Sequence, residues 1–413
     1  MNVSVGLMEA RTAIEVELLG AFIDASKKPF KPGKYRFTSE VTLTPSDPDS
    51  SGFAVPDMTI GIGFHWERQE RQVFRGPLRI IEKKTGLTLI NDVSLEEYVT
   101  SVISSEMSAS CPLELLKAHA VISRSWLWFP KASPSPDRAK HKETRTAPGE
   151  GLSSNEILRW YGRESHPDFD VCADDHCQRY QGITKAFSPA AADAVRATTG
   201  EFLRYNGEIC DARFSKCCGG MTEQYATAWE DLDIPYLRSF YDGATPPPSV
   251  SAETWIRTAP PAYCNTRDAE LLARILPGFD QETVDFYRWR VEYAAEELAQ
   301  IIKSKIGVDL GPIRDIQPLS RGPSSRIYRV RITGDSGSIM IGKELEIRRA
   351  LSRTHLYSSA FVANNESGRI VLRGAGWGHG VGLCQIGAAV MSISGKTYKE
   401  ILQHYYPETT VSV

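Results

Sequence analysis

The chain lacks a long apolar run, a strong net charge and a dense set of cysteines. No segment of its 413 residues approaches the roughly 18 to 20 consecutive apolar residues of a membrane-spanning helix. Its start also lacks the basic and apolar regions of a secretory signal peptide, which taken literally indicates a cytoplasmic protein. Because the chain opens directly on a predicted strand, however, a leader can have been removed, and the sequence does not decide the compartment. A formal net charge of −3 gives no field that attracts polyanions, which argues against nucleic acid and anionic membranes as partners. Eight cysteines are too few for a disulfide scaffold at this length.

What the chain has is a hydrophobic content of 41%, enough for a substantial core in two to three domains or in one large domain with insertions. Over residues 1–90, polar and apolar residues alternate in short runs, which predicts antiparallel strands. A capping-box pattern at 94–97 predicts a helix that ends near Glu106. A second helix is predicted from about Cys111, with Pro112 in its first turn.

We interpret residues 1–413 as one α+β region with antiparallel or mixed sheets and two insertions. Residues 130–165 are rich in proline, serine and charge, which is typical of a surface insertion. Within them, the basic run 138–145 is interpreted as a solvated loop rather than a binding patch. Residues 246–310 follow a proline-rich break and are predicted to form a largely helical insertion or subdomain. An amphipathic helix is expected at 398–405.

Glu106 is the first candidate for chemistry. It lies among the apolar residues Ile103, Met107 and Ala109, and such surroundings can raise the pKa of a carboxyl group until it stays protonated near neutral pH. A protonated carboxyl group can donate a proton to a leaving oxygen. The alternative is a solvated glutamate at the end of a helix.

A second candidate is the segment 166–177, which supplies two thiols, two imidazoles and several carboxylates. Thiolate and imidazole are the ligands that zinc prefers in tetrahedral sites. We assign His166, Cys172 and Cys177 as ligands, with His176 as a competitor for one position. A closed ligand set leaves no place for an activated water, which favours a structural zinc over metal-activated hydrolysis. The alternative is a surface loop whose cysteines are free or disulfide-bonded.

The third candidate is the glycine-rich segment 374–387. Its glycines permit positive φ angles and a close approach of the backbone to a ligand. Trp377 offers a flat apolar face for a sugar ring, and His379 and Gln385 offer hydrogen bonds. The spacing does not fit a phosphate-binding loop, and a purely structural turn is the alternative. Cys384, five residues after His379, is interpreted as a buried free cysteine rather than as half of a catalytic dyad.

Four ordered motifs together resemble a known family: residues 95–107, 112–125, 176–182 and 376–388. The chain is similar to the stage II sporulation protein D family, also called the SpoIID/LytB or amidase-enhancer family. The resemblance implies a peptidoglycan lytic transglycosylase that acts on glycan strands stripped of stem peptides, with Glu106 as the acid and base. Because the nucleophile is the substrate's own hydroxyl, one carboxylate suffices where an ordinary glycosidase needs two.

The resemblance also implies the zinc ligands His166, Cys172 and Cys177, although the two cysteines stand one residue closer than expected. This shortening leaves the choice between His176 and Cys177 open. Lys117 and Arg124, within the matched second helix, join Trp377, His379 and Gln385 as candidate substrate contacts. We expect the Glu106 helix, the Cys217–Cys218 loop and the glycine turn to border one cleft.

Three segments depart from the family pattern, at His119, at Cys217–Cys218 and at Cys384–Ile386. They lie at expected cleft positions, so substrate preference or activity itself can differ from the family. Some members enhance a partner amidase, which makes a cell-wall amidase a second expected partner beside the glycan strands. The resemblance suggests the cell envelope, the periplasm or export as the location.

Overall fold

The computed structural model describes residues 1–63, 67–132, 155–163, 166–245, 249–282 and 285–413. The chain divides into two compact units, and each is described by itself. Unit 1 comprises Met1–Arg124, Arg163–Glu201 and Ala273–Phe279, and unit 2 comprises Ser125–Gly162, Phe202–Leu272 and Asp280–Val413. Among the described helices, none is both long and apolar enough to cross a membrane.

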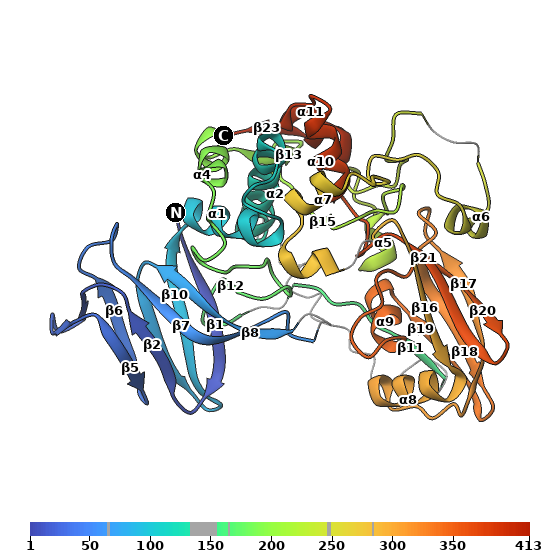
Figure 1. The fold of residues 1–413 in the computed structure, drawn as a ribbon, viewed down its shortest axis with the longest axis horizontal. Helices are drawn as coiled ribbons and strands as arrows, with labels where there is room; N and C mark the ends of the chain where they lie inside the picture. Colours follow the sequence, from blue (N-terminus) through green and yellow to red (C-terminus); the bar gives the residue numbers. More distant parts are fainter. Residues whose placement is uncertain (64–66, 133–154, 164–165, 246–248, 283–284) are drawn as a thin grey trace. The chain divides into compact units, whose positions relative to one another are not determined.

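Two β-sheets form most of unit 1 (blue strands in Figure 1). One has the order β12-β1-β10-β9-β6-β3-β4 and the other the order β5-β2-β7-β8. The first ten strands confirm the strands predicted over residues 1–90. In β2, Ile14, Val16 and Leu18 are buried whereas Glu15 and Glu17 are more exposed, as the period of two requires. The strands are β1 (Asn2–Arg11), β2 (Ile14–Leu18), β3 (Phe22–Asp24), β4 (Pro29–Phe30), β5 (Gly33–Phe37), β6 (Val41–Pro45), β7 (Gly52–Ile60), β8 (Arg68–Arg75), β9 (Leu78–Lys83), β10 (Gly86–Ser94) and β12 (Val171–Cys172).

Helix α1 (Leu95–Glu106) follows β10 directly and carries the predicted capping box. The Ser94 side chain accepts a hydrogen bond from the Glu97 backbone, and the Glu97 side chain accepts one from the Ser94 backbone. Such a cap stabilises a helix start by about 1 kcal/mol. Helix α4 (Pro189–Ala197) packs on α1, while α2 (Leu113–Ala132) and α7 (Ala269–Ile275) each have residues in both units.

The described residues of unit 2 form four further sheets, ordered β11-β19-β18-β17, β16-β21-β20, β14-β13-β23 and β15-β22. Their strands are β11 (Glu156–Leu158), β13 (Phe202–Tyr205), β14 (Glu208–Ile209), β15 (Phe214–Ser215), β16 (Arg288–Ala294), β17 (Ile313–Arg321), β18 (Ile327–Gly334), β19 (Gly337–Gly342), β20 (Phe361–Glu366), β21 (Arg369–Ala375), β22 (Leu383–Cys384) and β23 (Thr410–Ser412). The helices are α5 (Tyr225–Ala228), α6 (Ala252–Arg257), α8 (Ala295–Ile306), α9 (Glu344–Ala350), α10 (Gln385–Ile393) and α11 (Tyr398–Tyr405). A 3-10 helix at Gly278–Glu282 has residues in both units.

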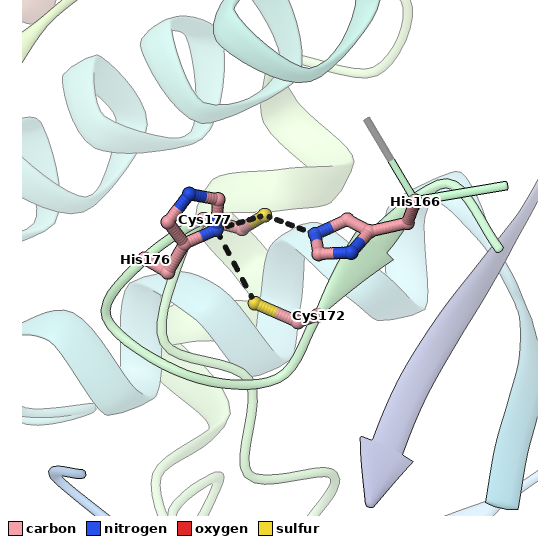
Figure 2. Close-up of side chains that lie close together, drawn as sticks. All are labelled: His166, Cys172, His176 and Cys177. Carbon is pink, nitrogen blue, oxygen red and sulfur yellow. Dashed lines mark hydrogen bonds between the residues drawn. The ribbon is translucent and has the colours of Figure 1, made fainter. Parts of the chain in front are cut away.

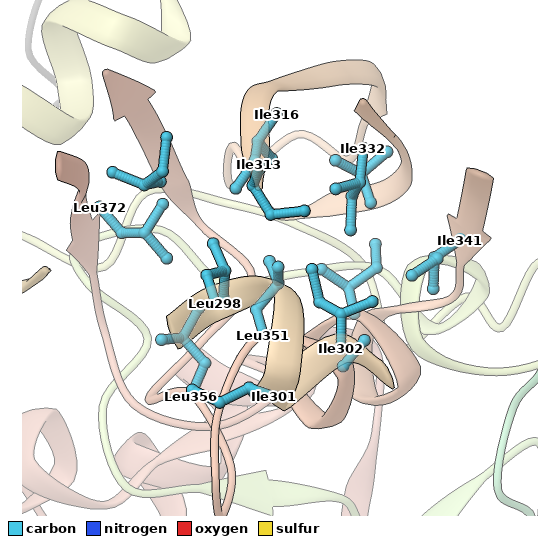
Figure 3. Close-up of a cluster of buried hydrophobic side chains, with 14 of the residues drawn as sticks. Leu298, Ile301, Ile302, Ile313, Ile316, Ile332, Ile341, Leu351, Leu356 and Leu372 are labelled. Atoms are coloured by element: carbon cyan, nitrogen blue, oxygen red, sulfur yellow. The ribbon is translucent and has the colours of Figure 1, made fainter. Parts of the chain in front are cut away.

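Helix α8 covers the main hydrophobic core of unit 2 (Figure 3). Leu298 and Ile302 point toward the side of the sheet that carries Ile313 and Ile332, whereas Ile301 is buried beside Leu356. Burial of each such side chain stabilises the fold by about 1.5 to 3 kcal/mol. The helix ends at Gly307, whose φ of 76° is left-handed and closes the last turn.

The α+β class predicted from the sequence is confirmed by these mixed and antiparallel sheets with packed helices. Region 246–310, predicted to be a largely helical insertion or subdomain, contains α6, α7 and α8 and also β16, which pairs with β21 over seven residues. Its status as an insertion stays a prediction. The insertion at 130–165 contributes β11, which pairs in parallel with β19. Its basic run 138–145 lies outside the described residues. Helix α11 matches the amphipathic helix predicted at 398–405 and begins with a second capping box.

Candidate functional site

Glu106 is the last residue of α1 and its side chain is half-buried. Ile103, Met107 and Ala109 are all buried, so the apolar neighbours expected from the sequence are in place. The Arg179 backbone N–H donates a hydrogen bond of 2.9 Å to Oε1 of Glu106. This bond fixes one carboxylate oxygen through a backbone group whose position the fold determines.

The segment that supplies this backbone group is fastened along α1. Tyr98 donates a hydrogen bond of 3.2 Å from its hydroxyl to Gln178, and the Gln181 N–H donates one of 3.2 Å to the Ser101 hydroxyl. The Tyr98 and Tyr180 rings stack with centroids 5.4 Å apart. Residues 178–181 therefore form a strap along the helix that carries Glu106.

The Arg179 side chain contributes a second fixed point. Its guanidinium binds Oδ1 of Asp175 at 2.5 and 3.0 Å and the Ser105 carbonyl at 3.4 Å. Both Arg179 and Asp175 are largely enclosed. Asp175 is thus the counter-ion of a guanidinium and is poorly suited to act as a second, nucleophilic carboxylate.

The structure brings His166, Cys172, His176 and Cys177 together in unit 1 (Figure 2). One ligand atom from each lies within 4.8 Å of all the others. The Cys177 sulfur is 3.4 Å from Nε2 of His166 and 3.5 Å from Nδ1 of His176, and the Cys172 sulfur is 3.8 Å from Nδ1 of His176. These spacings suit one tetrahedral metal ion with ligand distances of about 2.0 to 2.3 Å. All four residues lie close enough to bind one ion together, and the metal site stays a prediction.

Local packing positions two of these ligands. The His166 ring stacks on Phe169, with centroids 4.6 Å apart, and Phe169 fills the space where Gly6 has no Cβ. Cys172 lies in β12 opposite Gly6 of β1. The pKa of the Cys172 thiol is lowered because the Cys177 thiol donates a hydrogen bond to it, an effect that outweighs the burial of Cys172. A thiolate is the form that binds a metal.

A cavity of about 370 Å³ lies beside the cluster. Its wall includes His166, Cys172, His176 and Arg179, together with residues of β1 and β7. Asp174 also lines it, and burial, followed by the charge of Asp175, raises the pKa of Asp174 to about 6.

The two cationic residues predicted as substrate contacts differ in their surroundings. Lys117 is half-buried and pairs with Glu114 at 2.7 Å. Arg124 is fully buried, and its guanidinium binds Glu96 at 2.6 Å and the Glu201 carbonyl at 2.9 Å. The charge of Arg124 therefore serves to join α2 to α1, and its role as a substrate contact stays a prediction.

The glycine turn lies in unit 2 and wraps around a buried guanidinium. Arg326 donates hydrogen bonds to the Gly378 carbonyl at 3.1 Å, to the Cys218 carbonyl at 3.1 Å and to the Ser324 hydroxyl at 2.9 Å. At Gly380, where φ is 77°, an added Cβ would lie 2.5 Å from the Arg326 guanidinium. The turn is glycine-rich because its backbone approaches Arg326 this closely. This agrees with the alternative interpretation of the segment as a purely structural turn.

The polar and aromatic residues of this turn are also engaged by the protein. Nδ1 of His379 accepts a hydrogen bond of 3.0 Å from the Val381 N–H, and the pKa of His379 is well below its ordinary value because of burial and then the charges of Arg213 and Arg326. The Trp377 ring lies 4.5 Å from Tyr357 and 4.8 Å from Phe286, centroid to centroid. Gln385 is buried at the start of α10. Their roles as substrate contacts remain predictions.

Sequence reasoning missed Arg179 and Arg326. Arg179 stands two residues after the predicted ligand Cys177, and this proximity was the available signal. Arg326 stands alone before β18, and no pattern marks it. The predicted single cleft would need Glu106 of unit 1 beside the glycine turn of unit 2, and it stays a prediction.

Fold and site together define an α+β protein with one positioned carboxylate and a four-residue ligand cluster. Residues 83–205, which include Glu106 and the entire cluster, match the Stage II sporulation protein family (SpoIID). This match to part of the chain confirms the resemblance found in the sequence. Residues 223–382 match a second family, described as Domain of unknown function (DUF8618).

Individual relatives extend the similarity over most of the chain. Stage II sporulation protein D of Bacillus amyloliquefaciens is 25% identical over 337 residues, which cover 81% of this chain and 79% of the relative. The protein of the same name from Bacillus subtilis (strain 168) is 25% identical over 342 residues, with the same two coverages. The Amidase enhancer of Bacillus subtilis (strain 168) is 24% identical over 332 residues, which cover 75% of this chain and 40% of the enhancer.

Proposed function

We propose that this protein acts on the bacterial cell wall as a peptidoglycan lytic transglycosylase with Glu106 as its acid and base. The similarity to proteins named Stage II sporulation protein D and Amidase enhancer supports the cell-wall role. The cleaved bond is that between N-acetylmuramic acid and N-acetylglucosamine in glycan strands without stem peptides. The observation that carries the proposal is the hydrogen bond from the Arg179 backbone to Glu106.

One carboxyl group performs both proton transfers in this reaction. Protonated Glu106 gives its proton to the glycosidic oxygen as the bond from that oxygen to C1 breaks. The resulting carboxylate then takes the proton of the C6 hydroxyl, whose oxygen forms a bond to the same C1. The product carries a 1,6-anhydro end, no water is consumed, and Glu106 regains its proton.

The surroundings of Glu106 suit this double role. The Arg179 N–H holds Oε1, so the second oxygen has a fixed direction for proton transfer. Asp175 is occupied by the Arg179 guanidinium. A glycosidase that forms a covalent intermediate needs a second carboxylate about 5 to 5.5 Å from the first, whereas the proposed reaction needs none.

His166, Cys172, His176 and Cys177 are proposed to hold a structural zinc ion. Four protein ligands complete a tetrahedron and leave no position for a reactive water. The ion would supply rigidity at the end of the strap that begins with Gln178. The ligand residues of the chain would in this way keep the Arg179 N–H in position beside Glu106 during the reaction.

A second candidate function is enhancement of a cell-wall amidase without cleavage of the glycan. The name of the Bacillus subtilis relative favours it. The engagement of Trp377 and His379 within unit 2 also favours it, because these side chains have less surface left for a sugar. The two functions differ in whether Glu106 is needed.

Digestion of purified glycan strands, with and without stem peptides, tests the proposal. Mass spectrometry of the products should show anhydro ends with the wild type and none with Glu106→Gln. Glu15→Gln, on an exposed carboxylate of β2, is the matched control and should cleave like the wild type. Products that carry an added water would contradict the transglycosylase. An absence of cleavage with retained glycan binding, together with stimulation of an added amidase, would establish the second candidate.

A further inference from the structure

A second group of metal-binding side chains lies in unit 2, away from the cluster of Figure 2. Cys218, Asp242, Cys264 and Cys384 are all buried, and one ligand atom from each lies within 4.8 Å of the others. Neither the resemblance nor the proposed reaction gives these residues a role as metal ligands. They come from four separate segments of the chain.

The distances within this group suit one metal ion. With metal–sulfur bonds of about 2.3 Å, a tetrahedron places its sulfur atoms about 3.8 Å apart. The Cys218 and Cys264 sulfurs are 3.5 Å apart, and the Cys218 sulfur is 3.1 Å from Oδ2 of Asp242. A disulfide bond requires about 2.05 Å, and the cysteines are free.

The surroundings of Asp242 resemble the outer shell of a metal site. Its other oxygen, Oδ1, lies 3.0 Å from Nε2 of His404 and accepts a hydrogen bond of 2.9 Å from the Tyr405 hydroxyl. Such partners orient a ligating carboxylate. Oδ1 is therefore held by α11, while Oδ2 faces the sulfur of Cys218.

Backbone and side-chain groups offset the negative charge that thiolates would bring. The Cys218 N–H donates to the Cys384 sulfur at 3.2 Å, and the Gly220 N–H donates to the Cys218 sulfur at 3.4 Å. Two guanidinium groups bind the backbone of the same loop, Arg326 at the Cys218 carbonyl and Arg288 at the Gly219 carbonyl, each at 3.1 Å. Buried charge needs such compensation.

We propose that Cys218, Cys264, Cys384 and Asp242 bind a second zinc ion in a closed, structural site. Three soft sulfur ligands favour zinc over magnesium or calcium. The ion takes the place of the thiol protons, which leave for solvent as the metal–sulfur bonds form. Because the four ligands fill the tetrahedron, the ion joins loops and does not activate water.

The position of the site explains what such an ion would stabilise. Cys218 follows β15, Asp242 lies in the stretch between α5 and α6, Cys264 lies between α6 and α7, and Cys384 ends β22. These connecting segments have few long helices or strands of their own, so a metal that ties four of them together supplies folding free energy. Cys384 lies within the glycine-rich segment 374–387, and Cys217 of the Cys217–Cys218 loop pairs with Trp377 of the same segment.

The zinc content of the purified full chain tests the proposal. After dialysis, elemental analysis should find two zinc ions per chain in the wild type, one in Cys218→Ser/Cys264→Ser and one in Cys172→Ser/Cys177→Ser. Cys210→Ser, which replaces a buried cysteine outside both clusters, is the matched control and should retain two. A wild type with a single zinc, lost in Cys172→Ser/Cys177→Ser, would overturn the proposal.

A measurement on the wild type covers the case in which the Cys218→Ser/Cys264→Ser variant does not fold. Zinc X-ray absorption should give more than two sulfur ligands per zinc on average, since the cluster of Figure 2 alone provides two. An average of two would contradict the second site. A Cys218–Cys264 disulfide, found by mass spectrometry of protein purified with a thiol reductant, would contradict it as well. Neither readout depends on glycan cleavage.

Discussion

Replacement of Arg326 by lysine should destabilise unit 2 by about 3 kcal/mol. The Arg326 guanidinium donates to the Gly378 and Cys218 carbonyls and to the Ser324 hydroxyl, and its side chain is fully buried. Lysine keeps the charge but replaces a planar fork with a single ammonium group, which cannot reach all three acceptors in the same directions. The loss of two hydrogen bonds from a charged donor, each about 1.5 kcal/mol at the lower end of its range, gives this estimate.

The assay is urea unfolding followed by tryptophan fluorescence. Trp289 and Trp377 report on the glycine turn. The indole N–H of Trp289 donates a hydrogen bond to the Gly376 carbonyl, and the backbone N–H of Trp377 donates one to the Cys217 carbonyl. Arg331→Lys makes the same chemical change on an exposed position of β18 and should alter the free energy of unfolding by less than about 0.5 kcal/mol. An Arg326→Lys variant as stable as Arg331→Lys would refute the idea that the glycine turn is organised around this guanidinium.

Two further predictions concern single residues. Gly182→Ala should destabilise unit 1 by about 2 to 4 kcal/mol, because φ at Gly182 is 56° and an added Cβ would lie 2.2 Å from the Val73 carbonyl oxygen. The control is Gly278→Ala, where an added Cβ meets open space, and it should have little effect in the same unfolding assay. Because its pKa in the folded protein is well below the ordinary value of about 6.5, His379 stays neutral when folded and binds a proton when unfolded. Above pH about 6.5 this difference does not affect the free energy of unfolding. Below that value, the free energy of unfolding decreases by about 1.4 kcal/mol for each pH unit. His379→Gln should flatten the dependence of the unfolding free energy on pH between about 6.5 and 5 by one proton, and an unchanged slope would show that His379 protonates in the folded state.

Features that depend on neighbours in sequence were predictable. The alternation in β2 and the capping box of α1 are each contained within a few residues, so the sequence determines them without knowledge of the fold. His166, Cys172, His176 and Cys177, whose side chains the structure brings together, lie within twelve residues, so their proximity belongs to the same class of feature. The role predicted for Glu106 depended on the family resemblance, because a glutamate at the end of a helix is also typical of a solvated side chain.

Features created by distant partners were not predictable. Strand β16 was assigned to a helical region because its partner, β21, lies about 80 residues later in the chain. The second ligand group is an extreme case, since Cys218 is separated from Cys264 by 46 positions and from Cys384 by 166. No local spacing marks such a set, and only the folded chain brings it together.

The strap along α1 leads to a prediction about zinc that separates position from chemistry. The donor to Glu106 is the backbone N–H of Arg179, two residues after the proposed ligand Cys177. Removal of zinc by a chelator should therefore lower the melting temperature and loosen this donor, and glycan cleavage should fall together with stability. Any residual products should still carry anhydro ends, because the metal supplies no reactive water.

A zinc hydrolase predicts a different pattern in the same experiment. Chelation would then abolish cleavage without a change in melting temperature, and the products made before chelation would carry an added water. Cys177→Ser should behave like the chelated protein, whereas Cys111→Ser, a change at a buried cysteine outside the cluster, should retain both the melting-temperature response to chelation and the anhydro products. If Cys177→Ser cleaved glycan at the wild-type rate, the ligand cluster would have no part in positioning Glu106, and the hydrogen bond from Arg179 would have to be maintained by Tyr98, Ser101 and Asp175 alone.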